Sequence, residues 1–244
     1  MDLPVFIICR DRLSCLQQLT AWFTRAGLHD LILVDNASSY PPLLAWYEQC
    51  PWQVLRLPVN IGPRGLWSTP IIEQLTAGRK YLVSDCDILP DSSCPLDAVQ
   101  RLEELLERYP EADRVGLGLR IDDIPHHYPH RDLVIRWESQ FWETEVEPGV
   151  FLASVDTTFA LHRPWLKDRL TVGLRTGTPF IARHLPWYMD RGAMSEEDIY
   201  YEAHASRSFA NWNFAEAPLW KEEWLKKHGG EKHRHMISEP AGRD

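Results

Sequence analysis

The chain has 244 residues, enough for one domain with a full core, and 44% of them are hydrophobic and 25% charged. Its formal net charge of -9 argues against a nucleic-acid-binding surface, but is compatible with a local site for one phosphorylated small molecule. No stretch approaches the roughly 18 uninterrupted apolar residues of a membrane span, so we expect no integral membrane segment.

The five cysteines are odd in number and show no C-x-x-C spacing. This pattern indicates free thiols in a reducing compartment rather than a disulfide framework or a zinc site. The sequence opens directly on an apolar stretch at 5–8, without the basic leader and long apolar core of a signal peptide. We therefore expect a soluble, cytoplasmic protein.

The first part of the sequence predicts alternating strands and helices. Apolar runs at 4–9 and 31–34 are typical of buried strands, and apolar residues at helical spacing over 13–23 indicate a helix between them. A third strand is expected at 53–57. A short helix is expected over 43–49. Continuous apolar strands that alternate with helices favour a parallel sheet covered on both faces.

A loop rich in glycine and proline at 60–65 leads to Thr69-Pro70, where we expect a helix to begin and to run to Gly78. A fourth buried strand is expected at 81–83. The clearest helix of the chain is predicted over 95–109, because its apolar residues fall on one face.

The second half of the sequence is less regular. Strands are expected at 114–121, 151–154 and 158–161, and the segment 126–142 is interpreted as a long loop with a short helix. Ser195 and the acidic residues after it are placed to cap a further helix.

Two carboxylates one residue apart, Asp85 and Asp87, follow the strand at 81–83. Like charges at this spacing repel each other, and desolvation at the end of a buried strand increases the repulsion. A divalent cation such as Mg²⁺ or Mn²⁺ relieves both costs, because hard cations prefer oxygen ligands. The pattern therefore indicates a metal site, and a solvated turn with two surface aspartates is the structural alternative.

Polar clusters come directly after three of the predicted strands, at 10–12, 35–36 and 85–87. In open α/β sheets the ligand binds beyond the carboxyl ends of the strands. We therefore expect residues that are distant in the sequence to meet along one edge of the sheet, which strengthens the metal interpretation.

Together these segments resemble a GT-A glycosyltransferase of the family 2 type. The resemblance lies in the first strand at 4–9, the Val-Asp-Asn-x-Ser motif at 34–38, the Asn-Ile-Gly motif at 60–62 and the Asp-x-Asp motif at 85–87. Residues 183–188 resemble a segment that follows the acceptor region in some bacterial members. The resemblance implies one α/β GT-A domain with a mainly parallel central sheet.

In that family the first half of the domain binds a nucleoside diphosphate sugar, usually UDP-linked, with Mn²⁺ or Mg²⁺. The resemblance therefore implies a donor and metal half at 1–110 and an acceptor half at 111–225 within a single domain 1–244. The polar, basic tail at 226–244 is expected to be mobile at its end. The implied activity is sugar transfer, mostly with inversion, to a hydroxyl of a glycan or lipid-linked acceptor.

The resemblance also assigns individual residues. Asp35 matches the residue that hydrogen-bonds the base, with an Asx turn as its structural alternative. Asp85 would lie near the ribose and the metal, and Asp87 would bind the metal. His184 is the best match to the histidine that completes the metal shell, with a core or surface histidine as the alternative. The residues expected at the nucleotide sugar are Arg10, Asp35, Asn36, Asn60, Arg64 and Asp85.

The chemistry of sugar transfer supports these roles. Departure of the sugar builds negative charge on the diphosphate, which a metal ion and groups such as Arg10 or Arg64 would stabilise. Inversion also needs a base that takes the proton of the acceptor hydroxyl. Asp156 and Glu197 are the two candidates, and the sequence does not choose between them. Their structural alternatives are a turn cap for Asp156 and favourable acidity at a helix N-terminus for Glu197.

Two other functions use similar residues. A nucleotidyltransferase also has an α/β sheet and paired aspartates, but it usually carries a glycine-rich phosphate loop after the first strand, and 9–13 contains no glycine. A non-catalytic carbohydrate- or nucleotide-binding domain would keep the fold and tolerate the loss of Asp87.

Overall fold

The computed structural model describes residues 3–164, 172–207, 212, 214, 216 and 218–228. Of the tail that we expected to be mobile, residues 226–228 end the last helix, and the remainder lies outside the described residues. Within the described part of the chain, no helix is both long enough and apolar enough to cross a membrane.

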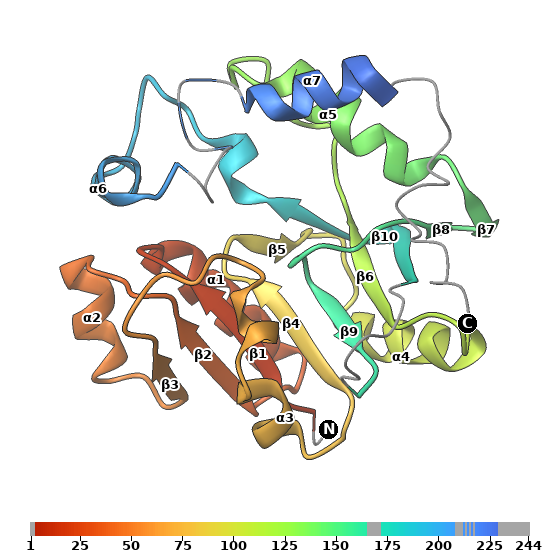
Figure 1. Cartoon of the computed structure of the whole chain (residues 1–244), viewed down its shortest axis with the longest axis horizontal. Helices are drawn as coiled ribbons and strands as arrows, with labels where there is room; N and C mark the ends of the chain where they lie inside the picture. The colour runs from red at the N-terminus through yellow and green to blue at the C-terminus, as the bar shows by residue number, and fades with distance from the viewer. Residues whose placement is uncertain are drawn as a thin grey trace, which may run out of the picture.

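The described residues form a sheet of ten strands in the order β3-β2-β1-β4-β9-β6-β10-β8-β7, with β5 paired to β10 (Figure 1). The strands are β1 (Val5–Cys9), β2 (Leu31–Asp35), β3 (Gln53–Arg56), β4 (Tyr81–Asp85), β5 (Ile88–Pro90), β6 (Arg114–Leu119), β7 (Glu145–Glu147), β8 (Val150–Leu152), β9 (Ala160–His162) and β10 (Gly173–His184).

The central part of the sheet is mainly parallel. Strands β3, β2, β1 and β4 pair in parallel, and β6 pairs in parallel with β10. Strand β9 lies between β4 and β6 and is antiparallel to both, so all these strands except β9 point in one direction. The predicted α/β class with a mainly parallel central sheet is confirmed.

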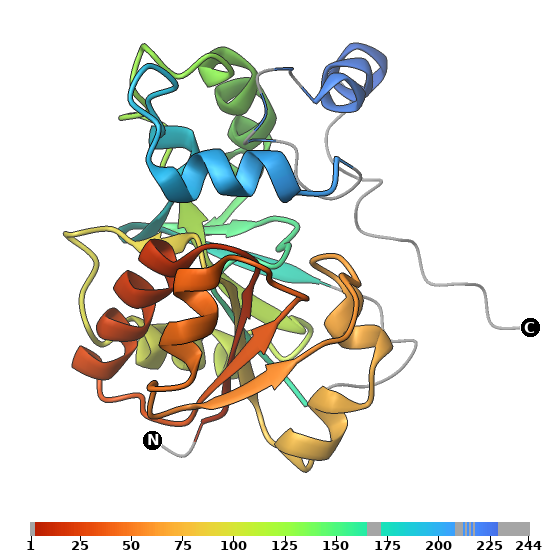
Figure 2. The same ribbon diagram turned by 90° about the vertical axis from the view of Figure 1, so that its left-hand side faces the viewer.

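The helices lie on both faces of the sheet and above its carboxyl-end edge. They are α1 (Leu13–Arg25), α2 (Pro41–Tyr47), α3 (Ile71–Thr76), α4 (Ala98–Arg108), α5 (Arg131–Ser139), α6 (Glu196–His204) and α7 (Leu219–His228). Figure 2 shows α1 and α2 side by side against the sheet, with α6 across their upper ends. Helices α5 and α7 pack together at the top of the molecule (Figure 1).

The hydrophobic core explains why the first strands are continuously apolar. Side chains alternate between the two faces of a strand, and both faces of β1 are covered. Val5 and Ile7 belong to the core cluster that includes α1 and α4, whereas Phe6 and Ile8 pack with α3 on the other face. All four side chains are less than 9% exposed.

Several elements are shorter in the structure than the sequence predicts. The helix expected to run to Gly78 ends at Thr76, because Ala77 and Gly78 both take left-handed backbone conformations with φ of 49° and 78°. The helix predicted over 95–109 spans Ala98–Arg108, and its apolar face is buried as expected.

Strand β10 was not predicted from the sequence. Its twelve residues do not keep one register, because the pairing with β6 shifts between Thr176 and Ile181. Gly177 and Pro179 lie inside this irregularity, where they interrupt the apolar pattern that identifies a strand. The missed strand matters because it ends at His184, one of the expected metal ligands.

Candidate functional site

A cavity of about 500 Å³ lies beyond the carboxyl ends of β1, β2 and β4. This is the position at which open α/β sheets bind ligands, because the loops after neighbouring parallel strands meet there. Its wall includes eight of the residues expected from the sequence: Arg10, Asn36, Asn60, Arg64, Asp85, Asp87, Asp156 and His184. Two expected residues, Asp35 and Glu197, do not line it.

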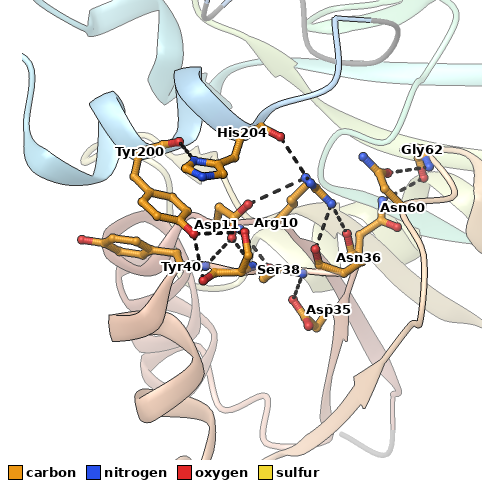
Figure 3. A network of polar contacts seen from close by, with 12 residues as sticks. Arg10, Asp11, Asp35, Asn36, Ser38, Tyr40, Asn60, Gly62, Tyr200 and His204 are labelled. Atoms are coloured by element: carbon orange, nitrogen blue, oxygen red, sulfur yellow. Dashed lines mark hydrogen bonds and ion pairs between the residues drawn. The ribbon is translucent and has the colours of Figure 1, made fainter.

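Arg10 joins the loop after β1 to the loop after β2 (Figure 3). Its Nη1 donates hydrogen bonds of 2.8 and 2.9 Å to the backbone carbonyls of Asn36 and Ala37, and its Nη2 donates one of 3.4 Å to the carbonyl of His204. The guanidinium is therefore fixed in the cavity wall by contacts to three carbonyl groups.

Asp11 supports this arrangement from below the cavity. Its carboxylate is fully buried and accepts hydrogen bonds of 2.6 and 2.7 Å from the backbone N–H groups of Ser39 and Tyr40. Its backbone has a φ of 50°, an unusual value for a residue other than glycine. The contacts with the second loop thus hold Asp11 in this conformation and orient Arg10, its neighbour in the chain.

The side chain of Asn36 shapes the next loop of the site. Its Oδ1 accepts a hydrogen bond of 2.9 Å from the N–H of Ile61, and its Nδ2 donates one of 3.3 Å to the carbonyl of Gly62. Asn60 accepts a bond of 2.9 Å from the N–H of Gly62, which has a φ of 76°. Both asparagines therefore fix the loop that carries Arg64 to the cavity.

Asp35 lies below the cavity floor and has structural partners. Its side chain is 0% exposed, and it accepts hydrogen bonds from the N–H of Ser38, the hydroxyl of Tyr47 and Nε of Arg56. The bond to Ser38 is the local turn that the sequence offered as the alternative. In this structure the carboxylate has no surface on the cavity, so contact of Asp35 with a base remains a prediction.

The two aspartates after β4 have different surroundings. Oδ2 of Asp85 accepts a hydrogen bond of 2.5 Å from the hydroxyl of Thr157, yet burial and the neighbouring charge of Asp87 raise the pKa of Asp85 well above its usual value. Burial alone would also raise the pKa of Asp87, but His184 and Arg12 outweigh it and lower this pKa. The pair therefore differs in proton affinity, with Asp87 the more readily ionised.

His184 lies beside Asp87, with 3.7 Å between Nε2 and Oδ2. The carboxylate oxygens of Asp85 and Asp87 are ligands of the kind that Mg²⁺ and Mn²⁺ accept, and the imidazole nitrogen of His184 suits a transition metal such as Mn²⁺ better than Mg²⁺. Their arrangement fits only in part, because the described residues contain no group of three histidine, cysteine or acidic side chains placed to hold an ion. Asp87 and His184 are together, while Asp85 is turned to Thr157.

Asp156 lies at the mouth of the cavity, in the segment before β9. Its Oδ1 is 3.1 Å from Nε of Arg64, and the two side chains are 55% and 75% exposed. An ion pair this exposed contributes on the order of 0–1 kcal/mol, so it holds the carboxylate only weakly. Asp156 is thus accessible to a ligand in the cavity.

Glu197 instead connects α6 to the start of α1. It is 7% exposed and accepts hydrogen bonds from the backbone N–H of Ser14 at 2.9 Å and from its hydroxyl at 2.6 Å. The N–H groups of the first helical turn have no partner within their helix, so a carboxylate here stabilises α1. This placement favours the structural alternative for Glu197.

Several charged residues of the cavity wall had no role predicted from the sequence. Arg12 forms a 2.5 Å ion pair with Asp198 and lies 3.9 Å from the ring centre of Tyr201, so it links the end of β1 to α6. Arg12 belongs to the polar cluster at 10–12, which was identified from the sequence. Arg175 and Lys221 lie on β10 and α7, where no motif identified them.

No protein-family model matches the sequence, and no curated protein matches it significantly. Among similar solved structures is S. aureus TarS 1-349, with 10% identity over 83% of this chain and 63% of that chain, and a TM-score of 0.45. Another is glucosyl-3-phosphoglycerate synthase from Mycobacterium tuberculosis in complex with Mn²⁺, UDP-glucose and phosphoglyceric acid. It has 14% identity over 66% of this chain and 56% of that chain, and a TM-score of 0.40.

A UDP-glucose pyrophosphorylase complexed with UDP-glucose is also similar, with 10% identity over 84% of this chain and 100% of that chain, and a TM-score of 0.48. The last two of these structures are complexes with UDP-glucose. The chain spans less than two thirds of the length of the first two structures. Because all three TM-scores are below 0.5, the likeness decides neither the reaction nor the substrate.

Proposed function

We propose that this protein is a glycosyltransferase that moves a sugar from a nucleoside diphosphate sugar, with UDP as the expected nucleotide, to an acceptor hydroxyl. One observation carries the proposal: a single cavity brings together two guanidinium groups, two adjacent carboxylates and an exposed carboxylate. They are Arg10, Arg64, Asp85, Asp87 and Asp156. A diphosphate needs positive charge, and an acceptor hydroxyl needs a base.

The nucleotide side of the cavity is formed by the loops after β1, β2 and β3. Arg10 is fixed there by backbone carbonyls, and Arg64 reaches the cavity from a loop that Asn36 and Asn60 hold in place. A guanidinium group that is already held in place, as that of Arg10 is, can bind a diphosphate with little rearrangement. Preorganised sites stabilise developing charge in this way.

Asp87 and His184 are the pair that would hold a divalent cation, with Asp85 as the third ligand expected from the sequence. The bound ion would supply charge stabilisation for the departing diphosphate as a Lewis acid. The chain itself supplies the positive charge of Arg12 beside this pair, which favours the ionised form of Asp87.

Asp156 is the proposed base. It faces the cavity, is exposed, and is held by a weak ion pair, so an incoming hydroxyl group can replace Arg64 as its partner. In the transfer, Asp156 would take the hydroxyl proton as the acceptor oxygen forms its bond to the sugar and the diphosphate leaves. General base catalysis of this kind typically contributes about a hundred- to ten-thousand-fold.

A thermal-shift panel with UDP, GDP, CMP and TDP, each with and without Mn²⁺, tests the proposal. Ligand binding to the folded state raises the melting temperature by mass action. We expect a metal-dependent rise for one diphosphate, and loss of that rise together with turnover in Asp87→Ala. Asp30→Ala is the matched control, because Asp30 is exposed at the opposite end of β2.

The other outcomes point to different functions. A response to nucleoside triphosphates instead of diphosphates would favour a nucleotidyltransferase. No response to any nucleotide would favour a non-catalytic binding domain. A metal-dependent response that persists in Asp87→Ala would remove Asp87 from the metal site.

A further inference from the structure

Lys221 of α7 lies in the cavity wall, away from the loops that form the nucleotide side. Its side chain is 8% exposed. Its Nζ lies 4.3 Å from the ring centre of Trp212, 4.4 Å from that of Trp137 and 5.1 Å from that of Trp220. These three indole rings also line the cavity, so an ammonium group and aromatic faces form one continuous surface.

The charges on this wall do not balance. Arg175 and Glu138 form an ion pair at 3.0 Å, and their side chains are 4% and 6% exposed, so each neutralises the other. The ammonium group of Lys221 has aromatic neighbours but no hydrogen bond or ion pair with any residue that the structure describes. One positive charge on this wall is therefore left without a counter-ion.

A buried ammonium group without a counter-ion is costly. Burial lowers the pKa of Lys221 to about 8, although Glu138 and Asp156 act in the opposite direction. The group is still mainly protonated at neutral pH. Contacts with aromatic faces attract the ammonium group but provide no net negative charge. An anion bound in the cavity would supply the negative charge that pairs with the ammonium group.

We propose that Lys221, with Trp137, Trp212 and Trp220, forms the acceptor subsite and selects a saccharide that carries an anionic substituent, a phosphate or a carboxylate. The apolar face of the sugar ring would pack on an indole, and the anionic group would pair with the ammonium. The inference rests on the proposed function, which assigns the opposite side of the cavity to the nucleotide.

The position of Asp156 supports this division of the cavity. Its carboxylate pairs with Arg64 on the nucleotide side, and its charge also acts on Lys221. The proposed base thus lies between the two sides, where a hydroxyl of the acceptor would meet the donor sugar. The order of the strands agrees, because β3, β2 and β1 lie at one end of the sheet and β10 lies beyond β4.

The test measures saccharide binding through quenching of tryptophan fluorescence in the full chain. The probes are glucose 6-phosphate, glucuronate, glucose and inorganic phosphate at constant ionic strength. We expect the wild type to bind one of the anionic sugars at least about tenfold more tightly than glucose, as a charge-assisted contact would give. Lys221→Met should remove this preference, and Lys221→Arg should keep most of it.

Lys227→Met is the matched control, because Lys227 lies on the same helix, is exposed, and carries the same charge. Trp220→Ala separates the contribution of the aromatic contact from that of the charge. This change should weaken the binding of anionic and neutral sugars by a similar factor. The melting-temperature response to UDP with Mn²⁺ is measured on every variant, so that donor binding is followed independently.

Three results would overturn the proposal: a preference for anionic sugars that survives in Lys221→Met, an equal loss in Lys227→Met, or no saturable quenching by any anionic sugar while UDP binds. A Lys221-dependent preference in a protein that does not bind UDP would support an anionic-saccharide site and count against the glycosyltransferase itself.

Discussion

Asp156 is the residue on which the proposed chemistry depends most directly. Asparagine keeps the size of the side chain and removes its basicity, so Asp156→Asn is expected to lower turnover at least about a hundredfold. The ion pair with Arg64 is exposed and weak, so stability should change little. Measured turnover, together with the melting-temperature response to the nucleotide, separates a loss of chemistry from a loss of donor binding.

Glu197→Gln is the comparison that tells the two candidate bases apart. Since Glu197 accepts two hydrogen bonds from Ser14, we expect this change to lower stability rather than to reproduce the loss seen in Asp156→Asn. A hundredfold loss of turnover in Glu197→Gln, with full turnover in Asp156→Asn, would reverse the assignment.

His162 on β9 makes stability dependent on pH. Its ring stacks on Tyr81 with 5.0 Å between ring centres, and its buried Nε2 has no hydrogen-bond partner among the residues that the structure describes. Burial, with a smaller effect of Arg114, lowers the pKa of His162 well below its usual value. The folded protein keeps this histidine neutral, whereas the unfolded chain binds a proton below a pH of about 6.5.

The unfolded state therefore binds more protons, and stability is lost as the pH falls from about 6.5 towards the pKa of the folded state. His162→Phe should lose less unfolding free energy than the wild type between neutral pH and about pH 5. Urea unfolding at several pH values measures the difference. His127→Gln, at an exposed position, should follow the wild type; an unchanged slope in His162→Phe would show that the loss arises elsewhere.

At the scale of elements, the start of α6 combines a helix cap predicted from the sequence with a contact to the cavity wall. The hydroxyl of Ser195 accepts from the N–H of Asp198, whose carboxylate accepts from the N–H of Ser195, so the predicted cap is confirmed. The same carboxylate pairs with Arg12 in the cavity wall. The cap thus positions a partner of Arg12.

Ser195→Ala removes the hydroxyl from this cap, and we expect a loss of about 1 kcal/mol of unfolding free energy. Chemical denaturation measures it. Ser195→Thr, which keeps a hydroxyl that can accept from the N–H of Asp198 and donate to its carboxylate, should recover most of the loss. No change in Ser195→Ala would mean that α6 is held by its packing and by Glu197 alone.

The sequence predicted β1, β2 and β4 and the polar residues that follow them, because strands buried on both faces are largely apolar and the ends of these three are marked by carboxylates, amides and charged side chains. It also predicted β3, although the residues of this strand are exposed or half-buried. Local sequence patterns do not show whether a polar side chain is buried beneath a cavity or exposed in it. We therefore predicted that Asp35 contacts a ligand, whereas in the structure its carboxylate accepts hydrogen bonds from Ser38, Tyr47 and Arg56.

The wall opposite the nucleotide side could not be predicted in the same way. Strand β10 contains a register shift, and α7 mixes charged and aromatic residues without a clear apolar face. Lys221 resembles a solvated lysine in the sequence, and only its packing against three tryptophans distinguishes it. Such a site depends on contacts between distant segments, which periodicity does not record.

At the scale of the whole molecule, the pairing of β6 with β10 joins β10, which carries residues of the cavity wall, to the central strands of the sheet. Gly118 lies in this pairing, and a Cβ atom there would overlap the carbonyl oxygen of Thr176 and the ring of Trp142. We expect Gly118→Ala to lower the unfolding free energy by at least about 2 kcal/mol, because neither neighbour can move without disturbing the sheet.

Thermal and urea unfolding measure this loss. Gly192→Ala is the control, since its Cβ would meet mainly the side chain of Asp190, which can move away. Equal stability of the two variants would show that the sheet can widen at Gly118.

The position of β9 in the sheet determines when β4 can be covered during synthesis of the chain. Strand β4 has β1 on one side and β9 on the other, and its partners in β9 are residues 160–162. During synthesis that edge of β4 stays without its partner until those residues leave the ribosome, and an uncovered strand edge invites association between chains. Thr157, which hydrogen-bonds Asp85, arrives at the same moment. The aspartates after β4 thus acquire their final surroundings only after the chain has been translated through β9.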